Sequence, residues 1–330
     1  MDENNNIKSD GSINIQKSPS KWTPLTVFFI LFSMLYLISI FISLKFISKN
    51  RKIRLDNDVI STVEKKNLKN KVAIIPIYGA IYKKDSSINE KGSDFIVSMI
   101  KRYGEDRNIK AIVLDINSGG GSVGAVQEIY SAIKKIKEQT RKPIIAHFGD
   151  VAASGAYYIS VACDKIISNP GTITGSIGVI FSTMQGEELF KKIGVKSNII
   201  KSGKFKDIGS FSREMTKEEK ALLQEMIDDT YNTFVEVVSS GRKIPKEKVK
   251  EIADGRVFTG NQAVQNGLVD KLGDLYDAID EAGIMAGIGK NPAVVRAKAG
   301  FFSSIFDMID SKISFINKVE TPLLEYKMVF

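Results

Sequence analysis

The chain of 330 residues is predicted to be an α/β protein with an N-terminal transmembrane helix. Short apolar runs typical of buried strands alternate with segments whose apolar residues recur at helical spacing, between residues 71 and 285. An apolar run without any charge, residues 23–44, precedes them. The alternation predicts a largely parallel, buried sheet covered by helices.

The elements follow one another in a regular order. Five apolar runs are predicted strands: 72–79, 109–116, 143–146, 165–168 and 195–200. Helices are predicted from Ser93, over 123–136, over 187–193, and from Thr216 to about residue 239. The last of these helices begins with a capping box, in which Thr216 and Glu219 each accept a hydrogen bond from the other's backbone N–H.

Residues 23–44 are predicted to form an uncleaved membrane anchor. At 1.5 Å per residue the run makes a helix of about 33 Å, enough to cross a hydrocarbon core of roughly 30 Å. The residues after it do not resemble a signal-peptide cleavage site. Residues 1–22 are expected to be a disordered cytoplasmic tail and residues 45–70 a linker. Taken alone, the greater number of lysines and arginines after the span would place the C-terminal part in the cytoplasm.

Composition excludes several other classes of protein. The net charge of +9 is spread over single lysines beside glutamates, so a nucleic-acid partner is not expected. The single cysteine, Cys163, allows no internal disulfide and no metal-ligand cluster, and we expect neither a metal nor a cofactor. Residues 286–330 form an apolar tail, interpreted as a terminal helix that packs on its own domain or on a neighbouring subunit. Contact with the membrane surface is the alternative.

Two segments carry candidate chemistry. Ser154 lies between Ala153 and Gly155 at the start of a predicted helix. The G-x-S-x-G pattern of a strained nucleophile elbow is missing, so on its own Ser154 reads as a helix N-cap. The glycines of residues 117–123 can present backbone N–H groups to an anion, or form only a flexible turn.

The base that would activate a nucleophilic Ser154 is a separate question. The only histidine, His147, is interpreted as a strand or core residue. A lysine can replace histidine as the base only when it is neutral, which requires desolvation. Spacing alone does not select one lysine.

Six ordered motifs resemble the bacterial signal peptide peptidase A family, the Ser-Lys dyad peptidases related to protease IV. They are Asn117–Val123, Val151–Gly155, Ile173–Ser176, Lys201–Asp207, Ser212–Thr216 and Asp254–Phe258, and the resemblance covers residues 70–285. It implies a Clp protease/crotonase-like fold in a membrane-anchored, self-associating serine peptidase. The expected domain spans residues 71–285.

The resemblance also implies roles for particular residues. Ser154 would be the nucleophile, Lys206 the general base and Ser176 the residue that orients the lysine. Backbone N–H groups of Gly120 or Gly121, with Gly121 preferred, and of Gly155 would form the oxyanion hole. Lys201 would have no catalytic role. Gly119 stands where the family usually has proline, which should make the loop more flexible.

The implied substrates are cleaved signal peptides and other unfolded apolar peptides, and the implied location is the bacterial inner membrane. The family's catalytic domain lies outside the cytoplasm, against the charge count, and we expect that orientation because large domains translocate regardless of local charge. Alternatives are an acyl-CoA hydratase or thioesterase of the crotonase type, a broader membrane-protein quality-control protease, and a non-enzymatic scaffold.

Overall fold

The computed structural model describes residues 28–41, 69–83, 92–297 and 324–328, in two compact units divided between residues 63 and 64. In the first unit, residues 28–41 form a helix whose side chains are all exposed. Within the described ranges, no helix is both long enough and apolar enough to cross a bilayer. The predicted anchor, residues 23–44, extends beyond the described helix at both ends.

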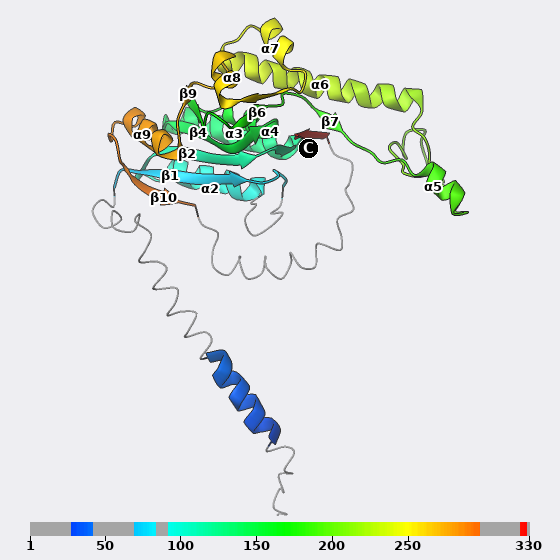
Figure 1. Cartoon of the computed structure of the whole chain (residues 1–330), viewed down its shortest axis with the longest axis horizontal. Helices are drawn as coiled ribbons and strands as arrows, with labels where there is room; N and C mark the ends of the chain where they lie inside the picture. Colours follow the sequence, from blue (N-terminus) through cyan, green and yellow to red (C-terminus); the bar gives the residue numbers. More distant parts are fainter. Residues whose placement is uncertain (1–27, 42–68, 84–91, 298–323, 329–330) are drawn as a thin grey trace, which may run out of the picture. The chain divides into compact units, whose positions relative to one another are not determined.

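The second unit is built on an eight-stranded sheet, which confirms the α/β class (Figure 1). Six strands follow one another in the order β10-β1-β2-β4-β5-β9, all parallel, and β6 pairs with β4 and, antiparallel, with β8. The strands are β1 (Lys71–Tyr78), β2 (Ile109–Ser118), β4 (Ile144–Ala153), β5 (Lys165–Ser168), β6 (Ile173–Gly175), β8 (Val257–Thr259), β9 (Lys271–Leu272) and β10 (Ala293–Arg296).

Helices cover both faces of this sheet. On one face α2 (Ser93–Glu105) and α3 (Val123–Thr140) pack on each other and on the main hydrophobic core. On the other face α9 (Leu275–Met285) packs on β1, β2 and β4 through Ala278, Ile279 and Ala282. Successive residues of β1 serve opposite faces: Ile75 belongs to the main core and Ile74 to the smaller one. Burial on both faces explains why the strand sequences are continuously apolar.

The other described helices of the unit, apart from α9, come after β4 in the chain. They are α4 (Gly155–Ser160), α5 (Glu187–Lys192), α6 (Lys217–Arg242), α7 (Lys246–Ile252) and α8 (Gly260–Gln265). The predicted capping box at Thr216 and Glu219 is confirmed, because each side chain accepts a hydrogen bond from the other's backbone N–H. Such a box satisfies two N–H groups that a helix leaves without partners.

The strand predicted over residues 195–200 is wrong. These residues have no regular structure and are all exposed. They belong to a projecting segment, residues 182–212, which we call the arm and which also carries α5 (Figure 1). An apolar run becomes a strand only where another strand pairs with it, and none does here among the described residues.

A second, three-stranded sheet contains β3 (Gly120–Ser122), β11 (Leu324–Lys327) and β7 (Ile180–Phe181), with β11 in the middle. β11 runs antiparallel to both neighbours. Both β10 and β11 lie in the segment 286–330 that the sequence suggested as an apolar tail, and both belong to sheets of the second unit. Residues 298–323 of that segment lie outside the described residues.

Candidate active site

Ser154 lies where β4 turns into α4, in a strained backbone conformation. Its φ is 54° and its ψ is −117°, and its residue surface is only 1% exposed. A non-glycine residue at positive φ is uncommon and costs conformational energy, which is typical of functional turns. The turn at Ser154 is therefore strained although the G-x-S-x-G pattern is missing. Ala153 has a small side chain and Gly155 has none, and a methyl group on Gly155 would lie 2.6 Å from Val126 Cγ2, so the tight turn needs glycine there.

The N-cap interpretation of Ser154 is not supported by its side chain. Ser154 occupies the N-cap position of α4, but its hydroxyl makes no capping hydrogen bond. Its backbone N–H donates to the carbonyl of Gly175 at 2.8 Å, which ties the turn to β6. The hydroxyl is thus available for chemistry at the N-terminus of a helix.

The glycines of residues 119–121 allow three backbone segments to meet beside Ser154. Gly120 has a φ of +97°, and a methyl group on its Cα would lie 2.7 Å from the nitrogen of Gly155 and 2.0 Å from the carbonyl oxygen of Tyr326. A methyl group on Gly121 would lie 2.0 Å from the carbonyl oxygen of Ile81. Only glycine leaves room for such close approaches. The glycines at 120 and 121 are therefore required for the backbone arrangement beside Ser154.

Ser176 opens onto the same cavity as Ser154. It follows β6 with a φ of 49°, and its N–H donates to the carbonyl of Arg256 at 2.8 Å. The cavity has a volume of about 650 Å³. Its walls come from β6 and β7, from α6, from residues 253–257 and from β11. The structure therefore brings together two of the predicted side chains, Ser154 and Ser176.

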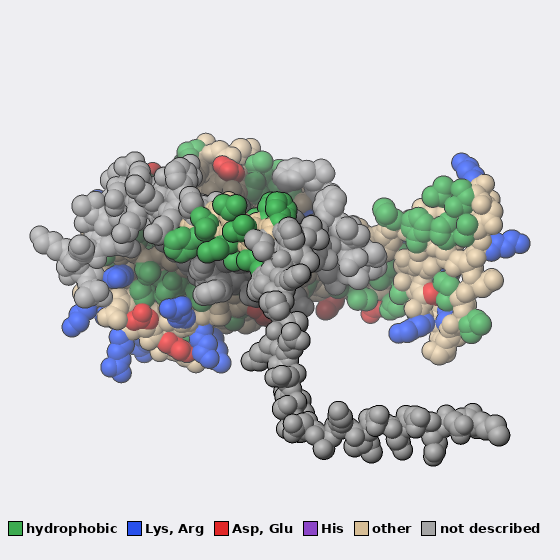
Figure 2. Space-filling view, turned by 90° about the horizontal axis from the view of Figure 1, so that it is seen from below, with side chains coloured by type: hydrophobic (Ala, Val, Ile, Leu, Met, Phe, Trp, Pro, Cys, Tyr) green, Lys and Arg blue, Asp and Glu red, His purple; other side chains and the backbone are tan. Residues whose placement is uncertain are grey.

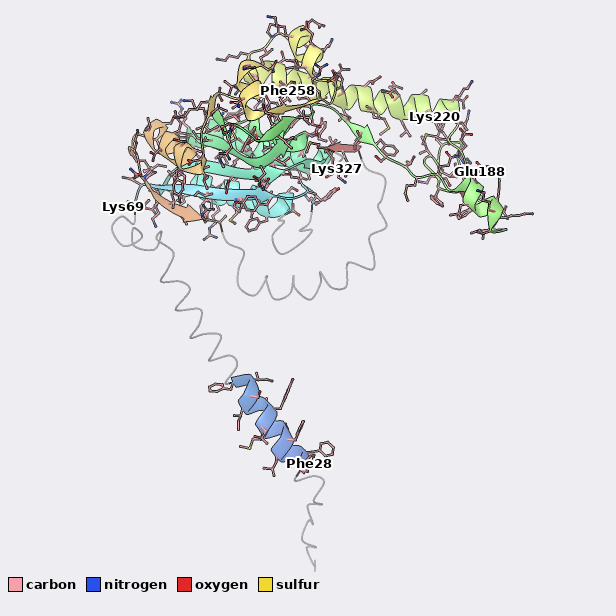
Figure 3. The ribbon with its side chains drawn as sticks, viewed as in Figure 1. Phe28, Lys69, Glu188, Lys220, Phe258 and Lys327 are labelled. Carbon is pink, nitrogen blue, oxygen red and sulfur yellow. The ribbon has the colours of Figure 1, made fainter. Side chains whose placement is uncertain are left out.

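Lys206 lies elsewhere, on the arm. Its side chain is exposed and is not among the residues that line the cavity. In Figure 3, the label Glu188 lies on the arm, past the end of α6 that carries the label Lys220. The label Lys327 lies on β11, beside the sheet. Within one chain the structure does not bring Lys206 to Ser154.

The other two lysines of the motif have partners. Lys201 Nζ contacts a carboxylate oxygen of Asp207 and donates to the carbonyl of Lys204 at 3.0 Å, and Lys204 Nζ pairs with Glu218. Among the described residues Lys206 has no ion-pair partner. In the described part of the chain, the amines of Lys201 and Lys204 are thus held in ion pairs, whereas the amine of Lys206 is not.

A network of ion pairs between side chains attaches the arm to α6. Arg213 bonds to Asp207 through Nε at 2.8 Å and to Glu219 through Nη1 at 2.9 Å. Hydrogen bonds from Arg213 and Lys201 lower the pKa of Asp207, and hydrogen bonds from Arg213 and Thr216 lower the pKa of Glu219 to about 2. The Lys201–Asp207 and Ser212–Thr216 motifs thus have a structural role that sequence reasoning did not assign.

This network predicts acid sensitivity of the folded chain. An unfolded glutamate has a pKa of about 4.3, so the stabilisation of ionised Glu219 is complete above that pH and is lost as the pH falls toward 2. We expect the melting temperature of Arg213→Met to lie below that of the wild type at pH 6, with the gap closing below about pH 4. A gap that is constant with pH would contradict this role of Arg213.

His147 is held in the sheet and does not line the cavity. Its Nδ1 lies 2.9 Å from Asp115 Oδ1, and Tyr78 donates to Asp115 Oδ2 at 2.5 Å. Burial and the bond to Asp115 raise the pKa of Tyr78 to about 12. The interpretation of His147 as a strand histidine is confirmed. In the described part of the chain, no three His, Cys, Asp or Glu residues are grouped to hold a metal.

Comparison with known proteins agrees with this fold. The sequence model of peptidase family S49 matches residues 136–289, and that of Clp protease matches residues 73–172. A putative protease of Synechocystis, slr0021, is 43% identical over 224 residues, which are 68% of this chain and 77% of the relative.

Two further relatives also have names that describe peptidases. The putative signal peptide peptidase SppA of Enterococcus faecium is 43% identical over 56% of this chain and 53% of its own length. Protease 4 of Haemophilus influenzae is 35% identical over 67% of this chain. This chain spans only 35% of that relative.

The fold is therefore that of an α/β protein with a Clp protease-like domain. The chain belongs to peptidase family S49, and it is a serine peptidase similar to signal peptide peptidase SppA.

Proposed function

We propose that this chain is a membrane-anchored endopeptidase that degrades residual signal peptides and other unfolded apolar peptides through Ser154 and Lys206. The observation that carries the proposal is the placement of Ser154: a buried serine on a strained turn, free of capping bonds, facing a cavity beside a glycine loop. A relative named signal peptide peptidase supports the substrate class.

The proposed reaction passes through an acyl-enzyme. Neutral Lys206 takes the proton of the Ser154 hydroxyl as Oγ attacks the peptide carbonyl, and the resulting oxyanion is held by N–H groups of Gly121, or Gly120, and Gly155. Lys206 then gives its proton to the leaving amine as the carbon–nitrogen bond breaks. Water then attacks the acyl carbon and gives a proton to the same lysine, which passes that proton to Ser154 Oγ as the ester bond breaks. Ser176 would hold the lysine in position from the cavity wall.

Because Lys206 is on the arm, we propose that it serves the Ser154 of a neighbouring copy of the chain. Apolar side chains that a monomer would expose to water lie along the arm: Met184, Leu189, Ile193, Val195, Ile199, Ile200, Phe205 and Phe211. Figure 2 shows hydrophobic side chains gathered on the lobe at the right, which is the arm. Exposed apolar patches of this kind favour association, so a homo-oligomer would bury the arm and complete the site.

The anchor belongs to the same proposal. Residues 23–44 carry no charge, and their described part, residues 28–41, is a helix with exposed apolar side chains. We propose a single crossing of the bacterial inner membrane with the catalytic domain outside the cytoplasm. Our proposed domain bounds remain 1–22, 23–44, 45–70, 71–285 and 286–330.

Covalent labelling tests the proposed nucleophile. A fluorophosphonate should form a phosphonate ester with Ser154 Oγ as fluoride leaves, which peptide mapping detects as one added phosphonyl mass on Ser154, and should stop peptide hydrolysis in proportion. Ser160, a buried serine that donates to the carbonyl of Ala156, provides the control and should stay unlabelled in Ser154→Ala protein. Turnover of acyl-CoA esters with an unlabelled Ser154 would instead support a crotonase-type enzyme.

A further inference from the structure

Three consecutive glycines, residues 119–121, include both candidates for the oxyanion donor that acts with Gly155. They connect β2 to β3, and no proline lies among them. Glycine restricts the backbone less than any other residue, so such a loop does not hold its N–H groups in one direction by itself. Donors stabilise an oxyanion best when they do not have to reorient during the reaction. The loop must therefore be fixed by groups outside it.

Ser118 fixes the loop from inside the molecule. Its hydroxyl oxygen accepts a hydrogen bond from the N–H of Gly120 at 3.1 Å, and its residue surface is only 2% exposed. Ser118 is the last residue of β2 and lies opposite Ala152 of β4. Asn117 also joins the ends of these two strands, and its Oδ1 accepts a hydrogen bond from the N–H of Val151 at 3.1 Å. Ser118 is thus held in place by the sheet and not by the loop that it contacts.

Ile81 fixes other backbone groups of the loop. Its N–H donates to the carbonyl of Gly120 at 2.9 Å, and its carbonyl accepts a hydrogen bond from the N–H of Ser122 at 2.9 Å. The side chain of Ile81 is buried in the main core. Since the N–H groups of successive residues in a strand point to opposite edges, the N–H of Gly121 is on the edge away from Ile81. That edge faces β11, whose Lys327 lines the cavity together with Ser154.

We propose that Ser118 is a positioning residue of the peptidase reaction, which takes the N–H of Gly120 and thereby leaves Gly121 as the loop's donor to the oxyanion. This inference rests on the proposed peptidase site. Gly121 and Gly155 are then the two donors, and the loop approaches Gly155 closely, since a methyl group on Gly120 would lie 2.7 Å from the Gly155 nitrogen. Gly120 has a structural role in this arrangement and donates no hydrogen bond to the substrate.

Loss of the Ser118 hydroxyl affects the transition state more than the bound substrate. Gly120 is buried, so its N–H would have to turn toward another acceptor. This turn changes the φ of Gly120, which is +97° in the structure, and moves the adjoining N–H of Gly121. An N–H group that serves the oxyanion matters only once negative charge develops on the substrate. We therefore expect kcat to fall while KM stays nearly constant.

Steady-state kinetics of full-length Ser118→Ala protein test this role. We expect kcat for a fluorogenic apolar peptide to fall about 10- to 100-fold, with KM within about two-fold of the wild type. Ser168→Ala is the matched control and should keep the wild-type kcat. Ser168 is a fully buried serine at the end of β5, its hydroxyl donates to the carbonyl of Asn169 at 3.0 Å, and it does not line the cavity. An unchanged kcat in Ser118→Ala, or a loss that appears entirely in KM, would overturn the role of Ser118.

Ser118→Cys distinguishes hydrogen bonding from packing. A thiol fills the space of the hydroxyl but is a weak hydrogen-bond acceptor, so kcat should fall nearly as far as in Ser118→Ala. Wild-type kcat in Ser118→Cys would mean that the side chain only fills space, and would contradict the proposal.

Binding of a peptide boronic acid tests the oxyanion site without turnover. Its boron forms a bond to Ser154 Oγ, the serine proton passes to Lys206, and a boron-bound oxygen of the tetrahedral adduct takes the place of the oxyanion. The inhibition constant should rise in Ser118→Ala by about the factor by which kcat falls, and an unchanged constant would argue against positioning. If the wild type neither cleaves peptides nor binds the boronic acid, the proposed function fails. If the wild type does both and Ser118→Ala does both equally well, only the role of Ser118 fails.

Discussion

Replacing Lys206 with alanine is expected to abolish peptide hydrolysis to the same extent as Ser154→Ala, by about 10³-fold or more in kcat. Each variant removes one of the two partners in the proton transfer that makes the serine nucleophilic. The losses of kcat should therefore be similar in the two single variants and should not add in the double variant. The measurement is kcat for a fluorogenic apolar peptide on purified, detergent-solubilised full-length protein.

Lys204→Ala is the matched control for this experiment. Lys204 is two residues away on the same exposed loop and is paired with Glu218, so its loss should change activity less than a few-fold. Lys201→Ala is less suitable because Lys201 contacts Asp207 and helps to hold the arm. If Lys206→Ala protein cleaves peptides at the wild-type rate, the dyad is wrong and Lys327, the lysine at the cavity, becomes the next base to test.

Mixing the two inactive variants should restore activity. A Ser154→Ala chain still has Lys206, and a Lys206→Ala chain still has Ser154. If each site takes its serine from one chain and its lysine from a neighbour, random co-assembly at equal amounts leaves about one quarter of the sites complete. Co-expression with two affinity tags, followed by sequential purification and a peptide assay, measures that fraction.

The same experiment distinguishes a dyad formed within one chain from a dyad shared between two neighbouring chains. A dyad formed within one chain predicts no activity when Ser154→Ala and Lys206→Ala are mixed, because every chain lacks one partner. A mixture of Ser154→Ala with Lys204→Ala provides the control and should be active in either case, because the Lys204→Ala chain keeps both Ser154 and Lys206. Activity that appears only in the mixed assemblies requires contact between the arm of one chain and the cavity of another.

Local sequence patterns predicted most of the regular elements. The continuous apolar runs of β1, β2 and β5 and the capping box of α6 depend on neighbouring residues and on burial of whole strands, so they are visible in the chain itself. The strand expected at residues 195–200 failed because its apolar side chains are exposed on the arm instead of facing a sheet. Hydrophobicity alone does not distinguish a core from an exposed contact surface.

The strained turn at Ser154 could not be read from its motif. Its φ of 54° depends on the meeting of β4, β6 and α4, where the N–H of Ser154 donates to Gly175, and not on a G-x-S-x-G pattern. The sequence suggested an apolar tail for residues 286–330, yet β10 pairs with β1 and β11 enters the catalytic site. Pairing between strands more than 200 residues apart leaves no periodic signal in either partner.

The sequence by itself determined the α/β class, the uncharged run before the domain, and the ordered motifs around Ser154, Ser176 and Lys206, because these depend on composition, spacing and local hydrogen bonding. Only the tertiary structure decided that Ser154 and Ser176 share a cavity, that Lys206 lies on an exposed arm, and that Tyr326 fills an aromatic pocket beside the glycine loop. These facts depend on contacts between distant parts of the chain, which chain folding creates and a linear motif does not contain.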